Sequence, residues 1–170
     1  MSLVQVATTS VSNVSTFSIT GIDTDNVYKL VLHELYMIAD GARPRMRFTK
    51  SSDSSADTSS NYDSRTMDQY TNQSFYDSGT VNSDYYNGFS IGTTNTESLM
   101  GVYYIYNFNN SSEYSFITIE EFTCNNAGEY AGRIGGACLT VNQATNGFMW
   151  HSSSGNIANA KATLYKVVGS

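Results

Sequence analysis

Short segments in which apolar and polar side chains alternate recur along this chain, and clusters of Gly, Asn, Asp or Ser separate them. Residues 14–19 form one such segment, with Phe17 and Ile19 on one face and Thr16 and Ser18 on the other. Successive side chains of a β-strand point to opposite faces, so this period of two predicts strands, and the separating residues are those that turns favour. The pattern therefore predicts an all-β protein.

The alternation predicts about eight or more strands joined by turns. We expect strands over residues 3–8, 14–19, 27–37, 43–48, 97–107, 114–124, 130–141, 147–152 and 158–168. Residues 27–37 have apolar side chains on both faces, which is typical of a central strand covered on two sides. A chain of 170 residues has the size of one ordinary domain, so we expect residues 1–170 to form a single antiparallel β-sandwich.

One long polar excursion interrupts these strands. Residues 50–65 are rich in Ser and Asp and have few apolar side chains, so we expect an exposed loop there. Residues 66–95 remain polar but contain several Tyr and Phe, and short strands are an alternative to loop in this part.

The composition narrows the classes of partner. Only 14% of the residues are charged, against about 25% in typical soluble domains, and Ser, Thr and Asn supply most of the polarity. The net charge is −6. Proteins that bind nucleic acid usually neutralise phosphates with a basic face, so we expect no nucleic-acid partner.

The residues needed for catalysis are sparse and poorly placed. His33 and His151 are the only histidines, and neither stands in a pattern with a nucleophile. His33 lies mid-strand and is best interpreted as a structural histidine. Glu120 and Glu121 are neighbours in an expected strand, so they point to opposite faces and cannot act together on one glycosidic bond. We therefore expect no enzymatic activity and no cofactor.

Metal sites and membrane insertion are also not expected. Cys124 and Cys138 each lack a nearby second cysteine, which favours buried free thiols over a metal site, and their pairing stays open. Asp53, Asp57 and Asp63 offer oxygen ligands for Ca²⁺ but lack EF-hand spacing, so we interpret them as part of a solvated loop. No signal peptide is evident, and no apolar run approaches the roughly 18 residues of a membrane span.

Two features suggest contact surfaces. Arg43, Arg45 and Arg47 would share one face of a strand, where they either dock an acidic partner or protect the strand from edge-to-edge aggregation. The region 61–89 combines tyrosines with Ser and Asn, a mixture that gives broad and adaptable contact area. Its alternative role is to close the open end of the sandwich. The candidate contact tyrosines are Tyr62, Tyr70, Tyr76, Tyr85 and Tyr86.

Two signatures at opposite ends of the chain are similar to a known family. The first is the strand at residues 27–32 (VYKLVL), followed by the turn Asp40-Gly41 and residues 46–49 (MRFT). The second combines residues 152–158 (SSSGNIA) with 163–165 (TLY). Together they resemble small bacteriophage virion structural proteins, which are common in phages of marine bacteria and cyanobacteria. That family has Gly or Ile soon after the Leu-Tyr pair, whereas Lys-Val-Val follows here.

The resemblance implies a jelly-roll-like sandwich located in the virion and made in the cytoplasm of a host bacterium. The expected role is a tail-fibre or receptor-binding module that contacts a host surface glycan or protein. One alternative is a capsid decoration protein on the outside of the head, and another, from a different class, is a carbohydrate-binding accessory domain. The expected partners are other fibre, tail or capsid proteins. Symmetric virion sites favour a homo-oligomer, with a trimer as the expected state.

Overall fold

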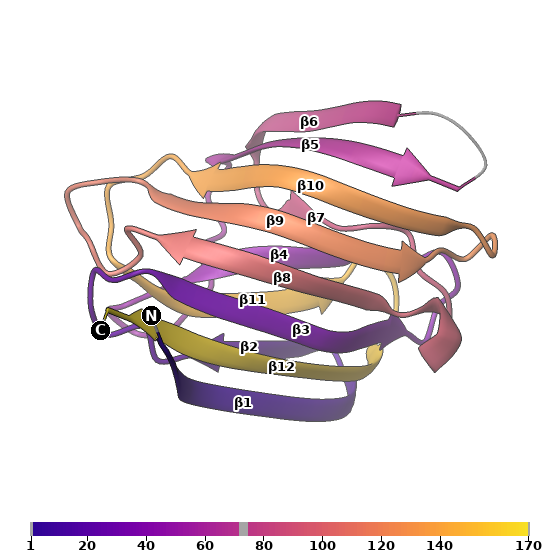
Figure 1. Ribbon diagram of the computed structural model, residues 1–170, viewed down its shortest axis with the longest axis horizontal. Helices are drawn as coiled ribbons and strands as arrows, with labels where there is room; N and C mark the ends of the chain where they lie inside the picture. Colours follow the sequence, from indigo (N-terminus) through magenta and orange to yellow (C-terminus); the bar gives the residue numbers. More distant parts are fainter. Residues whose placement is uncertain (1, 72–74, 170) are drawn as a thin grey trace.

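The computed structural model describes residues 2–71 and 75–169, and almost all of its regular structure is β. The strands are β1 (Ser2–Val14), β2 (Thr16–Thr20), β3 (Tyr28–Met37), β4 (Pro44–Lys50), β5 (Tyr62–Tyr70), β6 (Phe75–Ser83), β7 (Tyr86–Asn87), β8 (Leu99–Tyr106), β9 (Ser115–Cys124), β10 (Tyr130–Leu139), β11 (Thr145–Ser152) and β12 (Ile157–Val168), with one short 3₁₀ turn, η1 (Asn95–Glu97). They form an eight-stranded sheet in the order β1-β12-β3-β8-β9-β10-β5-β6 and a four-stranded sheet in the order β2-β11-β4-β7 (Figure 1).

The connectivity is that of a jelly roll with two insertions. The strands β1-β12-β3-β8 form one half of the jelly roll and the sheet β2-β11-β4-β7 forms the other, and the chain passes back and forth between them. The insertions are the hairpin β5–β6, between β4 and β7, and the hairpin β9–β10, between β8 and β11. Both insertions add to the same side of the larger sheet, and every pairing is antiparallel. The predicted antiparallel sandwich is confirmed.

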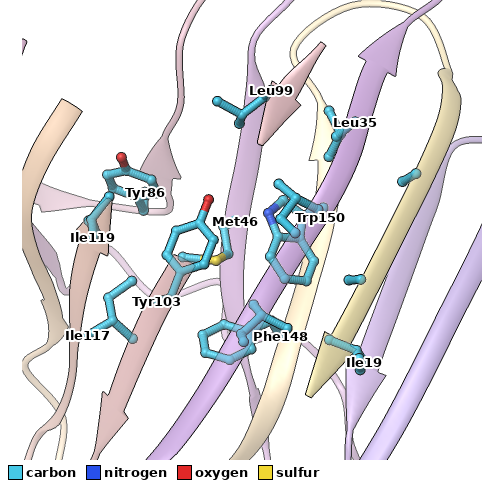
Figure 2. Close-up of a cluster of buried hydrophobic side chains, with 14 of the residues drawn as sticks. Ile19, Leu35, Met46, Tyr86, Leu99, Tyr103, Ile117, Ile119, Phe148 and Trp150 are labelled. Carbon is cyan, nitrogen blue, oxygen red and sulfur yellow. The ribbon is translucent and has the colours of Figure 1, made fainter. Parts of the chain in front are cut away.

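The alternating sequence pattern builds the core between the sheets. In β9 the side chains are alternately buried and exposed from Ser115 to Thr123, as a half-buried strand requires. In β4, Pro44, Met46 and Phe48 face inward, as their alternation with arginines predicted. Figure 2 shows side chains from both sheets meeting in this layer.

Aromatic rings dominate one part of the core. Phe48 packs against Phe108 and Phe148 at centroid distances of 4.6 and 5.5 Å, and against Tyr62 at 5.4 Å. Each such ring buries a large apolar area, and edge or tilted contacts add to the gain from burial. Trp150 extends the group through Phe148, with ring centroids 5.6 Å apart (Figure 2).

The polar excursion differs most from its sequence-based prediction. Residues 62–70 and 75–83 form the hairpin β5–β6, so strand replaces the expected loop at residues 62–65, and the alternative of short strands holds in the part from residue 66 onward. β5 pairs with β10 along its whole length. The inward face of β5 includes Thr66 and Asp68, both of which are buried although they are polar. The sequence pattern did not indicate this strand because two of its inward positions, Thr66 and Asp68, are polar. No helix in the described part of the chain has the length and apolarity needed to span a membrane.

Candidate ligand-binding site

The end of β5 and the turn between β9 and β10 lie at the same end of the sandwich (Figure 1). Side chains from these parts of the chain line a polar pocket. Its volume is about 410 Å³, within the range of small-molecule sites. Residues from four separate parts of the chain line it: Arg43 before β4, Tyr70 and Tyr76 of the β5–β6 hairpin, Ser90 after β7, and Asn125 and Glu129 of the β9–β10 turn. Three of these six were singled out from the sequence: Arg43, Tyr70 and Tyr76.

The connections that supply Arg43 and Ser90 are bonded to each other. The Gly41 N–H donates to the Ile91 carbonyl, and the Ser90 hydroxyl donates to the Gly41 carbonyl at 2.8 Å. The Arg43 guanidinium donates to the Gly88 carbonyl at 3.2 Å. These bonds hold one wall of the pocket in a fixed conformation.

The β9–β10 turn adjoins this wall, because Asn125 forms a β-bridge with Ile91. The Asn125 side-chain oxygen accepts the N–H groups of Ala127 and Glu129, each at 2.9 Å, while its amide donates to a Glu129 carboxylate oxygen at 3.1 Å. Gly128 takes a positive φ of 76°, which glycine adopts without strain. The turn therefore presents an amide and a carboxylate on a rigid backbone.

Two tyrosines give the pocket an aromatic side. The rings of Tyr70 and Tyr76 meet edge to face at 5.6 Å, and Tyr76 is 54% exposed. Tyr70 in turn meets Phe89 edge to face at 6.1 Å. Burial, and next the nearby Asp68 carboxylate, raise the pKa of the Tyr70 phenol, so it remains a neutral hydrogen-bonding group at physiological pH.

A buried arginine supports the floor of this aromatic group. The guanidinium of Arg133 lies 4.2 Å from the centroid of the Phe89 ring. It also donates two hydrogen bonds to the Asp68 carboxylate, at 2.6 and 2.7 Å, and one to the Asn87 carbonyl at 2.9 Å. Although burial lowers it, ion pairing with Asp68 keeps the pKa of Arg133 above its ordinary value.

A second carboxylate completes this network. Glu121 is 5% exposed and accepts hydrogen bonds from Tyr103 at 2.8 Å and Tyr86 at 3.1 Å, while Arg133 approaches to 3.7 Å. Burial raises the pKa of Glu121, and Arg133 and the tyrosine hydroxyls oppose that rise. We refer to Asp68, Tyr86, Tyr103, Glu121 and Arg133 as the buried polar network. Its groups are bonded to one another, so it supports the pocket and does not itself present free groups to a ligand.

The pocket can hold a polar, uncharged or zwitterionic molecule by hydrogen bonds and ring stacking. The arrangement of one guanidinium, one carboxylate, one amide and exposed aromatic faces suits a molecule with many hydroxyls. Across the ranges 2–71 and 75–169, no group of three or more His, Cys, Asp or Glu side chains gathers to hold a metal ion.

We refer to Arg43, Arg45 and Arg47 as the arginine stripe. These arginines mainly contact other residues of the same chain. Arg47 pairs with Asp84 at 2.6 Å and also donates to the Asp84 carbonyl at 2.8 Å. Arg45 stacks on the Tyr85 ring at 4.2 Å. The segment between β6 and β7 thus covers the outer side of β4, and it reduces the area that these arginines and Tyr85 offer to a partner.

Two of the candidate contact tyrosines are core residues, and the prediction of surface contact is wrong for them. Tyr62 is 1% exposed and its hydroxyl accepts the Phe48 N–H at 2.9 Å. Tyr86 is 3% exposed and belongs to the buried polar network. Each ring lies on the inward face of its strand. The sequence-based prediction expected these rings to be exposed because their neighbours in the sequence are polar.

The remaining polar candidates are engaged locally. The Asp57 carboxylate accepts hydrogen bonds from Ser59 and Gln143, and the Asp63 carboxylate accepts the Asn82 N–H. His33 is exposed on β3, and its Nε2 lies 3.0 Å from the Thr163 hydroxyl.

The two thiols are free. Cys138 lies opposite Phe116 at one end of the β9–β10 hairpin, and Cys124 lies opposite Tyr130 at the other end. This places the thiols on the order of 27 Å apart along the strands, too far for an internal disulfide.

Sequence reasoning missed Ser90, Asn125, Glu129 and the supporting Arg133. The one feature of the sequence that could have indicated the role of Arg133 was its charge, which stands in a glycine-rich strand of a chain poor in charge.

Comparison of the chain with protein-family models gave no match, and comparison with curated proteins also gave none.

Proposed function

We propose that this chain is a virion surface domain that binds a saccharide of the host cell surface, in the pocket lined by Arg43, Tyr70, Tyr76 and Glu129. The observation that carries the proposal is the pocket itself, which has a volume of about 410 Å³ and is lined by both aromatic and hydrogen-bonding side chains. The virion location rests on the resemblance of the two terminal signatures to phage structural proteins.

Saccharide recognition follows from the chemistry of the lining. A sugar ring offers an apolar face of C–H groups and a rim of hydroxyls. Tyr76, with its exposed ring, suits the face, and the side chains of Arg43, Asn125 and Glu129 suit the rim. The hydrogen bonds that fix both walls lower the entropy lost on binding.

The contacts that the arginine stripe makes within the chain favour saccharide binding over capsid decoration. A capsid-binding face built on Arg43, Arg45 and Arg47 would have to displace the contact of Arg45 with Tyr85 and that of Arg47 with Asp84. The pocket needs no such rearrangement.

An array of bacterial surface saccharides, including O-antigen and capsular oligosaccharides, tests the binding function. We expect Tyr76→Ala and Arg43→Ala each to weaken binding of a captured saccharide by roughly tenfold or more, because each removes one contact of about 1–2 kcal/mol. Tyr114→Ala is the matched control, since Tyr114 is 43% exposed and lies before β9, away from the pocket. Equal binding by all three variants would refute the assignment of the pocket.

The virion location has its own test. Immunogold labelling of intact particles with an antibody against this chain is expected to mark the tail or fibres. Label over the head would make the chain a decoration protein, and absence of label with accessible antigen would refute the virion role.

A further inference from the structure

The outer edge of β6 has no partner within the described residues. β6 is the last strand of the eight-stranded sheet and pairs only with β5 in that part of the chain, and its residues are exposed from Phe75 to Asn82. An open edge presents a row of backbone N–H and C=O groups that another strand can pair with. Proteins usually protect such edges with Pro, Lys or a bulge.

β6 lacks most of these protections. Its sequence, FYDSGTVNS, contains no Pro and no Lys. Its charged residue, Asp77, pairs with Arg65 of the neighbouring strand, so the edge is locally neutral in a chain of net charge −6. The register shift lies at the far end, where Asn82 has a φ of 56°, and residues 75–81 remain available for pairing.

The opposite edge of the same sheet is less open. β1 leads directly into β2, and the Thr9 hydroxyl donates to the Ser18 carbonyl at 3.2 Å. The Val6 side chain lies against Gly21, beyond the end of β2. β1 also carries a register shift between Gln5 and Ala7. These features hold β1 against the smaller sheet and interrupt its register, whereas residues 75–81 of β6 are exposed and lie outside the register shift.

We propose that β6 is a dimerisation edge, at which two copies of this chain pair antiparallel about a two-fold axis at Ser78. The sequence of β6 complements itself in this register. Phe75 of one copy faces Val81 of the other, and these side chains are 69% and 73% exposed in the single chain. An aromatic residue opposite a β-branched one is a favourable cross-strand pair, and the two-fold axis forms it twice.

The other pairs of this register are compatible with it. Asp77 faces Gly79 of the second copy, which leaves room for the ion pair with Arg65. Tyr76 faces Thr80, again an aromatic residue opposite a β-branched one. The seven paired residues provide about six to eight interchain backbone hydrogen bonds. The contact is small, so the dimer forms reversibly at micromolar or higher concentration.

Sedimentation equilibrium of the full chain over a concentration series tests this edge. We expect the native chain to shift from 18.6 kDa towards twice that mass as concentration rises. Ser78→Lys is expected to raise the dimer dissociation constant by roughly tenfold or more, because two like charges then lie directly opposite each other at the axis. Thr118→Lys, on the exposed face of β9, adds the same charge away from the edge and is expected to dimerise like the native chain.

A mixture of variants tests the register itself. Ser78→Lys and Ser78→Asp are each expected to remain monomeric alone at a concentration where an equimolar mixture forms a heterodimer, because only in the mixture do opposite charges meet at the axis. A native chain that stays monomeric throughout overturns the proposal. So does a dimer or trimer that Ser78→Lys leaves unchanged, or a mixture that fails to associate.

Discussion

Replacing Arg133 with Met removes the positive charge at the centre of the buried polar network and keeps most of the side-chain volume. Arg133 is 5% exposed, and its loss leaves the carboxylates of Asp68 and Glu121 buried without a counter-charge. Breaking a buried ion pair from one side costs about 3–5 kcal/mol. This is a large part of the roughly 5–15 kcal/mol by which domains are stable.

Urea denaturation followed by tryptophan fluorescence measures this loss directly. Trp150 is the single tryptophan and is 2% exposed, so its emission reports global unfolding. Arg65→Met is the matched control, because Arg65 forms an ion pair with Asp77 in which both side chains are mostly exposed. We expect the control to lose at most about 1 kcal/mol of unfolding free energy.

The pH dependence provides a second check on the same reasoning. Burial already raises the pKa of Glu121, and removal of Arg133 raises it further. A carboxylate with a raised pKa in the folded state binds a proton more readily there than in the unfolded chain, so folding of the variant is favoured as pH falls. The loss caused by Arg133→Met should therefore be smaller at pH 5 than at pH 7. A loss equal to that of Arg65→Met at both pH values would refute the network's role.

Two further predictions concern the smaller sheet. Burial, with Arg47 and Arg45 nearby, lowers the pKa of His151 to about 4. Between pH 4 and 6.5 the unfolded chain therefore binds more protons at His151 than the folded chain does, so the free energy of unfolding falls as pH falls through this window. Because His151 is only half-buried, we expect this free energy to fall by about 1 kcal/mol from pH 7 to pH 5. His151→Gln should abolish that part of the pH dependence, and an unchanged urea profile would contradict it. Gly147→Ala should lower the free energy of unfolding by about 1–3 kcal/mol or more, because the added Cβ would collide with the backbone of the neighbouring β2. Gly132→Ala is the control, because its Cβ would meet its nearest atom at 3.8 Å, and thermal unfolding should show almost no change.

The sequence predicted the strands whose inward positions are apolar. Residues 115–124 illustrate this, because Ile117 and Ile119 alternate with exposed positions and the structure has the same alternation. The hairpin β5–β6 could not be predicted in the same way. Thr66 and Asp68 face inward on β5, and Asp68 is stabilised there by Arg133, a residue far away in the sequence.

The candidate site was predicted only in part for a related reason. Arg43 was recognisable as part of a basic strand face, and Tyr70 and Tyr76 as aromatic residues in a polar region. Ser90 and Glu129 reach the pocket through connections whose meeting depends on the strand order of the whole sandwich. Such a meeting of separate loops carries no local signature in the sequence.

The unequal width of the two sheets has a consequence for substitution tolerance. The larger sheet has eight strands and the smaller has four, so β7, at the edge of the smaller sheet, faces β10 through the hydrogen bonds of Arg133 to Tyr86 and Asn87. The inward positions at this edge include Asp68 and Arg133, whereas the same face of β3 has Leu30 and Leu32. We expect random mutagenesis with selection for folding to accept a polar side chain on the inward face of β5 or β10 only where a hydrogen-bonding partner accompanies it, and to reject polar side chains on the inward face of β3.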